Sequence, residues 1–137
     1  MSIDALEVGA GPLELHIAPI SRTTLALFAG ASGDINPIHI DLDVARSAGL
    51  EDVFAHGMLS MAYLARLLTD AFPQERLRSY KVRFASITPV HGSPTCTGSV
   101  TSIDTVDGER RATLALKVAL ADGTVTLLGE AVVAVDH

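Results

Sequence analysis

Cysteine, tryptophan and positive charge are scarce in this chain. Its 137 residues include one cysteine, Cys96, and no tryptophan. A single cysteine excludes an internal disulfide and a cysteine-based zinc site. Ten Lys and Arg residues stand against 16 Asp and Glu residues, which gives a net charge of −6. The densest basic cluster consists of Arg76, Arg78, Lys81 and Arg83. Because nucleic-acid binding needs clustered basic residues, nucleic acid is not an expected partner.

Long hydrophobic runs are also missing. No apolar stretch approaches the roughly 20 residues that a membrane-spanning helix needs, so no membrane partner is expected. The opening residues MSIDALEVGAGPL carry Asp4 and Glu7 but no early Lys or Arg, unlike a secretory signal or an Arg-rich transit peptide. We therefore expect a cytoplasmic protein. The length fits one domain, predicted over 1–137 with residues 1–12 as a loose lead-in.

The first half of the chain predicts one strand and several helices. Residues 13–20 alternate as a short strand does, and Ser21 offers an N-cap for a short apolar helix. A second short helix is indicated at 41–49. Residues 57–72, GMLSMAYLARLLTDAF, are apolar on most sides, which is typical of a buried helix.

The second half predicts four strands, at 77–88, 94–106, 110–121 and 124–135. The dipeptides Asp107-Gly108 and Asp122-Gly123, which separate the last three, are strong hairpin signals. The second half is therefore predicted to be an antiparallel meander. Together with one buried helix, around which the sheet would curl, this gives a single α+β domain.

Polar residues concentrate in the stretch SGDINPIHID, residues 32–41. Pro37 disfavours a regular helix there. Asp34 and His39, five positions apart, would diverge on a helix and lie on opposite faces of a strand, so only a turn lets them converge. A converging Asp and His can hold a water and transfer protons by general acid–base catalysis. A solvated Asx-Pro turn is the alternative interpretation.

A metal site is not expected in this stretch. Its spacing of oxygen and nitrogen ligands fails the EF-hand pattern. With Asp34 as the first ligand, the required Gly would be His39 and the required Glu would be Ala45.

His56-Gly57 precedes the long apolar helix. The N-terminus of a helix has free N–H groups and the positive end of the helix dipole. Gly57 has no side chain to block a close approach, so a carbonyl oxygen could be polarised there, as in an oxyanion hole. A simple connection into the helix is the alternative.

The motif FAGASGDINPIHID, followed by AHGML at 55–59, resembles the MaoC-like (R)-specific enoyl-thioester hydratases and dehydratases. The later segment YKVRF (80–84) resembles the same family. Within it, the catalytic subunits of mycobacterial-type (3R)-hydroxyacyl-carrier-protein dehydratases are the most similar. The resemblance implies a hotdog fold, in which an antiparallel sheet wraps a long central helix. It covers roughly residues 10–135.

The resemblance also implies a reaction, the reversible syn addition of water to a trans-2-enoyl thioester, giving the (3R)-hydroxyacyl thioester. Asp34 and His39 would be catalytic, with the assignment of the two protons left open. The N–H of Gly57 would bind the thioester carbonyl. The remaining candidate substrate-binding residues are Asn36, His56, Ser60 and Arg83. CoA or an acyl-carrier protein would carry the substrate, and no cofactor is expected, since the chain has neither a dinucleotide-binding nor a Walker motif.

Two other functions remain open. A hotdog acyl-CoA thioesterase usually places its carboxylate on the long helix, where this chain has only Asp70, near the end. A non-catalytic hotdog subunit of a heterodimeric dehydratase would be expected to have lost Asp34, His39 or Gly57. Because hotdog domains usually pair and an open edge strand is a liability, we expect a homodimer. A heterodimer with a non-catalytic hotdog subunit is the alternative.

Overall fold

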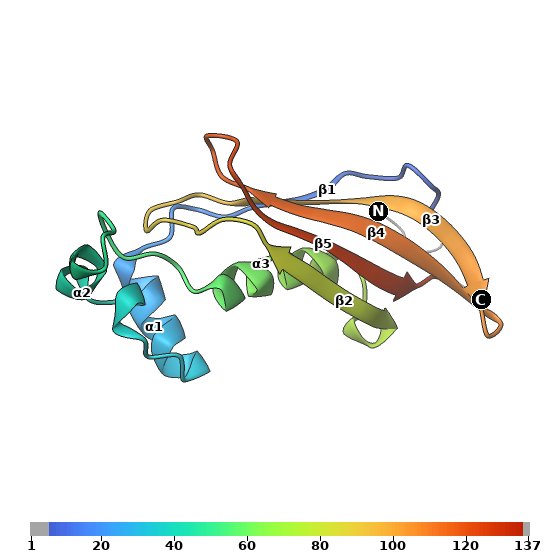
Figure 1. Ribbon diagram of the computed structural model, residues 1–137. Coiled ribbons are helices and arrows are strands. Elements are labelled where there is room, and N and C mark those ends of the chain that lie inside the picture. Colours follow the sequence, from blue (N-terminus) through green and yellow to red (C-terminus); the bar gives the residue numbers. More distant parts are fainter. Residues whose placement is uncertain (1–5, 136–137) are drawn as a thin grey trace.

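In the computed structural model, which describes residues 6–135, a five-stranded antiparallel sheet carries one long helix on one face, and shorter helices extend beyond one end of the sheet (Figure 1). The elements are β1 (Leu13–His16), α1 (Arg22–Ser32), α2 (Leu42–Ser47), α3 (Gly57–Ala71), β2 (Leu77–Phe84), β3 (Thr95–Val106), β4 (Glu109–Ala119) and β5 (Val125–Ala134). Single 3₁₀ turns lie at Pro37–His39 and Gln74–Arg76.

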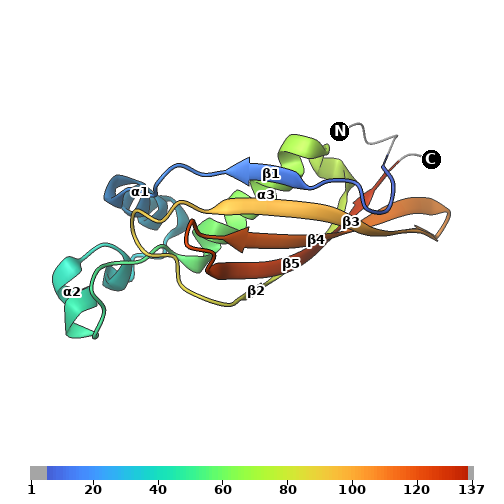
Figure 2. The same ribbon diagram turned by 90° about the horizontal axis from the view of Figure 1, so that it is seen from above.

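The strands follow the order β1-β3-β4-β5-β2, as Figure 2 shows from above. The predicted meander is correct for β3, β4 and β5. It is wrong for β2, which pairs with β5 at the far edge and not with β3. Strand β2 also ends at Phe84, earlier than the predicted 88. The connection that follows crosses the end of the sheet, and its Ala85 and Ser86 amides both donate to the carbonyl of Thr126.

The two predicted hairpin turns are present. Asp107 and Gly108 both have positive φ, 51° and 76°, the combination that a type I′ turn requires and that suits the twist of the paired strands. At the second turn Gly123 has φ 90°, and Asp122 accepts a hydrogen bond from the amide of Thr124. Local backbone preference therefore determines the positions of both hairpins.

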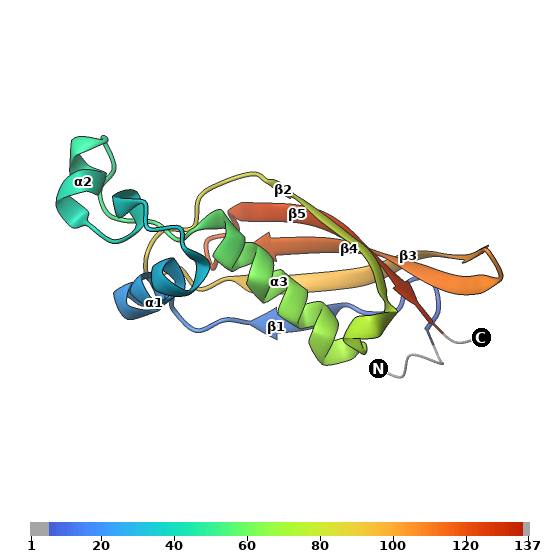
Figure 3. The same ribbon diagram turned by 90° about the horizontal axis from the view of Figure 1, so that it is seen from below.

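Helix α3 crosses the concave side of the sheet, as Figure 3 shows from below. Leu64, Leu67 and Leu68 of α3 are almost fully buried against residues of β3, β4 and β5. The prediction that the helix is buried nearly all round is only partly correct, because Met58 is 57% exposed and Ala62 is also exposed. The reason is geometric, since one sheet covers only one side of a helix.

A second apolar cluster lies where α1 and α2 extend beyond the sheet. It contains buried residues of α1, α2, the first turn of α3 and the segments before α1, before α3 and before β3: Ile17, Ile20, Leu25, Ala45, Val53, Ala55, Leu59 and Val90. Ser21 caps α1 as predicted, by accepting a hydrogen bond from the amide of Thr24. Arg22 makes a bidentate ion pair with Asp52 at 2.9 and 2.6 Å, which ties α1 to the segment before α3.

The predicted loose lead-in is only partly described, because residues 1–5 lie outside the described part. Leu6 is 1% exposed and belongs to the main core. The amide of Gly9 donates to the carbonyl of Val100, and the amide of Val100 donates to the carbonyl of Ala10. Residues 6–10 are therefore fixed to β3. Within residues 6–135, no helix has the length and apolar character needed to cross a membrane.

Candidate active site

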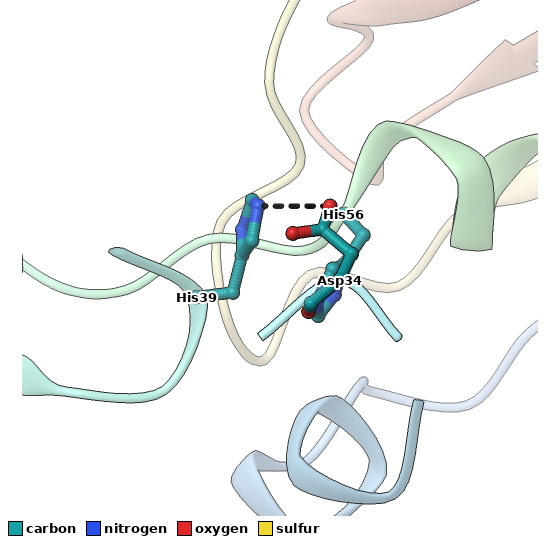
Figure 4. A group of neighbouring side chains, drawn as sticks. All are labelled: Asp34, His39 and His56. Carbon is teal, nitrogen blue, oxygen red and sulfur yellow. Dashed lines mark hydrogen bonds and ion pairs between the residues drawn. The ribbon is translucent and has the colours of Figure 1, made fainter. Parts of the chain in front are cut away.

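The polar stretch forms a turn between α1 and α2. Gly33 ends α1 in the left-handed region, at φ 79°. Asn36 then accepts a hydrogen bond from the amide of Ile38 through its side-chain oxygen, and Pro37 opens the 3₁₀ turn. The turn brings Asp34 and His39 together, with 4.0 Å between Oδ2 and Nε2 (Figure 4). Asn36 thus supports the turn. Its backbone N–H also donates to Oδ1 of Asp34 at 3.3 Å.

His39 is held in a defined orientation. Its Nδ1 lies 2.8 Å from the carbonyl oxygen of Phe54. Because a carbonyl can only accept, Nδ1 must carry the proton, and Nε2 is the nitrogen that faces Asp34. His39 is 8% exposed, whereas the side chain of Asp34 is 53% exposed. The 4.0 Å gap is too long for a direct hydrogen bond and suits a water molecule that contacts both groups.

His56 contacts both Asp34 and His39. Its Nε2 donates to the backbone carbonyl of Asp34 at 3.0 Å. Its ring stacks on that of His39, with centroids 3.9 Å apart and 29° between the planes. Phe28 packs edge-on against the ring of His56. His56 is 1% exposed, and among the described residues its Nδ1 has no hydrogen-bond partner. Through the hydrogen bond and the ring stack, His56 fixes the backbone of Asp34 and the ring of His39 relative to each other.

The nitrogen and oxygen atoms of Asp34, His39 and His56 lie within 4.8 Å of one another, close enough to ask whether they bind a metal. The stacking of the two imidazoles argues against it. A histidine binds a metal along the lone pair in its ring plane, at about 2.0–2.1 Å for zinc. Two nearly parallel rings 3.9 Å apart cannot both direct in-plane lone pairs at one ion. The cluster is better suited to holding and moving protons.

Gly57 is the first residue of α3, immediately after His56. No side chain caps this end of the helix, and the first N–H groups of a helix have no partner within it. A side chain at this position would meet the ring of Phe84, since an added Cβ would lie 2.9 Å from Phe84 Cε1. The structure thus places the α-carbon of Gly57 close to an aromatic ring from β2, a contact that the sequence does not indicate.

A cavity of about 300 Å³ opens beside Gly57. Its lining residues are Phe54, Ala55, Gly57, Ser60, Phe84, Ala85, Ser86, Ile87, Thr88 and Leu127. Phe54 connects the cavity to Asp34 and His39, because its ring packs edge-on against the ring of His39. Ser60 lies in the wall as the sequence indicated. Thr88 is not indicated by the sequence, because its segment has the alternation of a strand.

Arg83 does not join this group. It is exposed and lies on the face of β2 opposite that of Phe84, as successive residues of a strand must. It borders a separate cleft with Lys81 and Glu130. Within one chain Arg83 is therefore on the outer side of the sheet, away from the cavity beside Gly57.

Cys96 is fully buried in the main core, and burial raises the pKa of its thiol to about 11. A thiol in this environment stays protonated at neutral pH, which argues against a nucleophile.

Comparisons with known proteins identify the family. The model for the MaoC like domain matches residues 6–120. The (R)-specific enoyl-CoA hydratase of Rhodospirillum rubrum is 32% identical, over 85% of this chain and 80% of that protein. The 3-hydroxyacyl-thioester dehydratase Z of Mycobacterium tuberculosis is 29% identical, over 72% of this chain and 70% of that protein. The solved (R)-hydratase from A. caviae involved in PHA biosynthesis has a TM-score of 0.84 at 28% identity, covering 96% of this chain and 98% of that one. The hotdog fold implied by the sequence resemblance is confirmed, and the chain belongs to the MaoC-like domain family.

Proposed function

We propose that this protein is an (R)-specific hydratase/dehydratase that adds water reversibly to trans-2-enoyl thioesters to give (3R)-hydroxyacyl thioesters. The observation that carries the proposal is the geometry of Asp34 and His39. They face each other across 4.0 Å, next to the cavity whose mouth holds the free helix N-terminus at Gly57. The similarity to enzymes named as hydratase and dehydratase supports the same reaction.

The chemistry can be assigned to these groups as follows. One of Asp34 and His39 takes a proton from the bound water, whose oxygen forms the new bond to C3. The electron pair of the C2–C3 double bond moves toward the thioester, and the negative charge on its oxygen is stabilised by the Gly57 N–H. A proton is then delivered to C2 from the same face, which gives syn addition. Neutral His39 presents the Nε2 lone pair to the water, so either residue fits the role of base.

No cofactor takes part in this proposal. The reaction needs only water, groups that transfer protons and one donor to the thioester oxygen. CoA or an acyl-carrier protein only carries the acyl group. Asn36 and His56 hold the turn and the pair in place. We propose no direct catalytic role for Arg83. The cytoplasmic location stays a prediction.

The first experiment follows the enoyl-thioester absorbance of crotonyl-CoA in the presence of the protein. We expect the absorbance to fall without release of free thiol. Asp34→Asn and His39→Ala should each reduce the rate by roughly 10²–10⁴-fold, the usual contribution of a general acid or base. Unchanged rates in both variants would contradict the assignment, and release of thiol would favour a thioesterase.

The thioesterase alternative has little support in the geometry. Asp70, the one acid of α3, lies 13 residues after Gly57, which is about 20 Å along a helix. It is exposed and pairs with Arg66 at 3.6 Å. A non-catalytic subunit is also disfavoured, because the turn, the pair and the open helix end are all present.

We further propose a homodimer that joins two sheets along β2. This strand is an open edge of the sheet, and the unpaired N–H and C=O groups of an edge strand can pair with the same strand of a second copy. Light scattering should give twice the mass of one chain. A monomer that is fully active at the same concentration would contradict this proposal. A monomer that becomes active only with a second hotdog subunit would favour the heterodimer.

A further inference from the structure

The cavity beside Gly57 has a polar group at its inner end. Ser60 is 1% exposed and Thr88 is 3% exposed, and both line the cavity. Their hydroxyl oxygens lie 3.4 Å apart. Leu127, beside them, is 1% exposed. Two buried hydroxyls therefore face a space that is otherwise walled mainly by apolar side chains.

The two hydroxyls do not satisfy each other completely. Each has one donor and two acceptor positions, and among the described residues their mutual contact is the one hydrogen bond that either side chain makes. That contact uses a single O–H. The second O–H is free to donate to an acceptor in the cavity, and leaving it unpaired would cost free energy. The pair is thus matched to a ligand that carries a hydrogen-bond acceptor.

The burial of the lining residues gives the direction in which a substrate enters. Gly57, Phe84 and Ile87 are exposed and form the mouth, whereas Ser60 and Thr88 are buried. A bulky carrier must stay outside, so the acyl chain points inward. Ser60 follows Gly57 by three residues, which is about 4.5 Å along the helix. With carbon–carbon bonds of about 1.5 Å, an extended chain bound through its C1 oxygen at Gly57 covers that distance by its fourth or fifth carbon.

We propose that Ser60 and Thr88 form a specificity subsite for acyl groups that carry an oxygen near the fourth or fifth carbon. This inference rests on the proposed function, because it uses the thioester position at Gly57. It goes beyond it by naming the class of acyl substrate. A purely aliphatic chain of the same length would leave the hydroxyl donor unpaired and is therefore the poorer substrate.

The test compares two thioesters of equal length, trans-2-hexenoyl-CoA and 4-methoxy-trans-2-butenoyl-CoA, in which an ether oxygen replaces carbon five. Native protein should hydrate the ether with the higher kcat/KM, by roughly 3- to 10-fold, the usual effect of one hydrogen bond between neutral groups. Ser60→Ala and Thr88→Val should each remove this preference, so that the ratio of the two kcat/KM values falls to about one.

The matched control is Thr126→Val. Thr126 is as buried as Thr88, but its hydroxyl contacts the carbonyl of Val118 at 3.4 Å and does not line the cavity. This variant should keep the preference for the ether. A native protein that prefers the hexenoyl chain, or a preference that survives in both Ser60→Ala and Thr88→Val, would overturn the subsite.

Calorimetric binding of the saturated analogues, hexanoyl-CoA and 4-methoxybutanoyl-CoA, separates this inference from the proposed function. If neither enoyl thioester is hydrated, the hydratase proposal fails. The ratio of the two dissociation constants, in native protein and in the three variants, then still decides the subsite. If both are hydrated at equal kcat/KM and bound equally, the subsite fails and the hydratase proposal stands.

Discussion

Asp34 and His39 differ in how firmly the protein holds them. His39 is buried and hydrogen-bonded to the carbonyl of Phe54, and its ring stacks on that of His56 and meets the ring of Phe54 edge-on. The Asp34 side chain is exposed, and the backbone carbonyl of Asp34 is what His56 holds. The histidine is thus fixed in tautomer and direction, whereas the carboxylate can adjust its angle to water and substrate.

His56 permits a test with two variants that separate its two contacts. His56→Phe keeps the ring stack but removes the donor to the Asp34 carbonyl. His56→Gln keeps a donor but removes the stack. If the hydrogen bond positions Asp34, His56→Phe should lower kcat by roughly tenfold, since a hydrogen bond between neutral groups contributes about 0.5–1.5 kcal/mol. The value of KM should change little, and His56→Gln should recover most of the rate.

Steady-state kinetics with crotonyl-CoA measure this, and far-UV circular dichroism checks that both variants are folded. A His56→Phe protein as active as the native one would show that the hydrogen bond does not matter. Equal losses in both variants, with KM raised, would point to general damage to the site instead.

Several site residues could be predicted from the sequence because the signal is local. Gly33 and Pro37 force a turn, and a turn is what brings Asp34 and His39 together. The roles of Phe54, Phe84 and Thr88 depend on contacts between segments that are distant in the sequence, so no local pattern reveals them. Arg83, a member of the basic cluster, was expected to bind substrate, but strand alternation places it on the face of β2 opposite that of Phe84, which lines the cavity.

At the scale of elements, the N-terminus of α3 combines two demands at Gly57. Alanine is favoured over glycine in helices by about 0.5–1 kcal/mol. An alanine Cβ would, however, press on the ring of Phe84 at 2.9 Å, next to the proposed oxyanion donor. We predict that Gly57→Ala changes the free energy of unfolding by less than about 1 kcal/mol but lowers kcat/KM by roughly 10²-fold.

Urea denaturation and crotonyl-CoA kinetics check the two halves of this prediction. The double variant Gly57→Ala/Phe84→Ala is the control, because it removes the ring that the new methyl group meets. Partial recovery of activity in the double variant would identify the ring as the cause. Full activity in Gly57→Ala itself would exclude a close approach of substrate at this amide.

The elements themselves were predictable to different degrees. The cap at Ser21 and the turn at Asp107-Gly108 depend on neighbours in sequence, and the structure confirms them. The pairing of β2 with β5 joins Lys81 to Glu130 across almost 50 positions, and alternation within a strand carries no information about its partner. The exposed side of α3 was missed for a related reason, since apolar residues such as Met58 and Ala62 do not reveal how many sides are covered.

At the scale of the whole molecule, an ion-pair cluster lies at the end of the sheet opposite the catalytic turn (Figure 1). Glu109 accepts hydrogen bonds from Arg78 at 2.9 Å and from Arg111 at 2.8 Å. The hydrogen bond from Arg78, followed by that from Arg111, lowers the pKa of Glu109 from 4.5 to about 2. A lowered folded-state pKa means that this stabilisation is present above pH 4.5 and is lost as the pH falls toward 2.

Glu109→Gln should therefore unfold at lower urea concentration than native protein at pH 7. The difference should shrink between pH 4.5 and pH 2. Urea curves at pH 7, 4.5, 3 and 2 measure it, and Glu14→Gln, an exposed acid on β1 without an ion pair in the described part of the chain, is the control. Because the cluster is remote from Asp34, crotonyl-CoA activity at pH 7 should be unchanged. A constant difference at all four pH values would contradict the lowered pKa.

The two apolar clusters have a consequence for how such an enzyme can diversify. The cluster around Leu25 and Ala45 supports the turn that carries Asp34 and His39. The cavity is walled by α3, by the end of β2 and the segment after it, by β5, and by Phe54 and Ala55 from the segment before α3. Apart from Phe54, Ala55 and Gly57, the residues that line the cavity differ from those that hold Asp34 and His39 in place. Substitutions around the cavity can explore new acyl groups while the proton relay is inherited intact, so the fold is open to divergent evolution and to redesign of specificity.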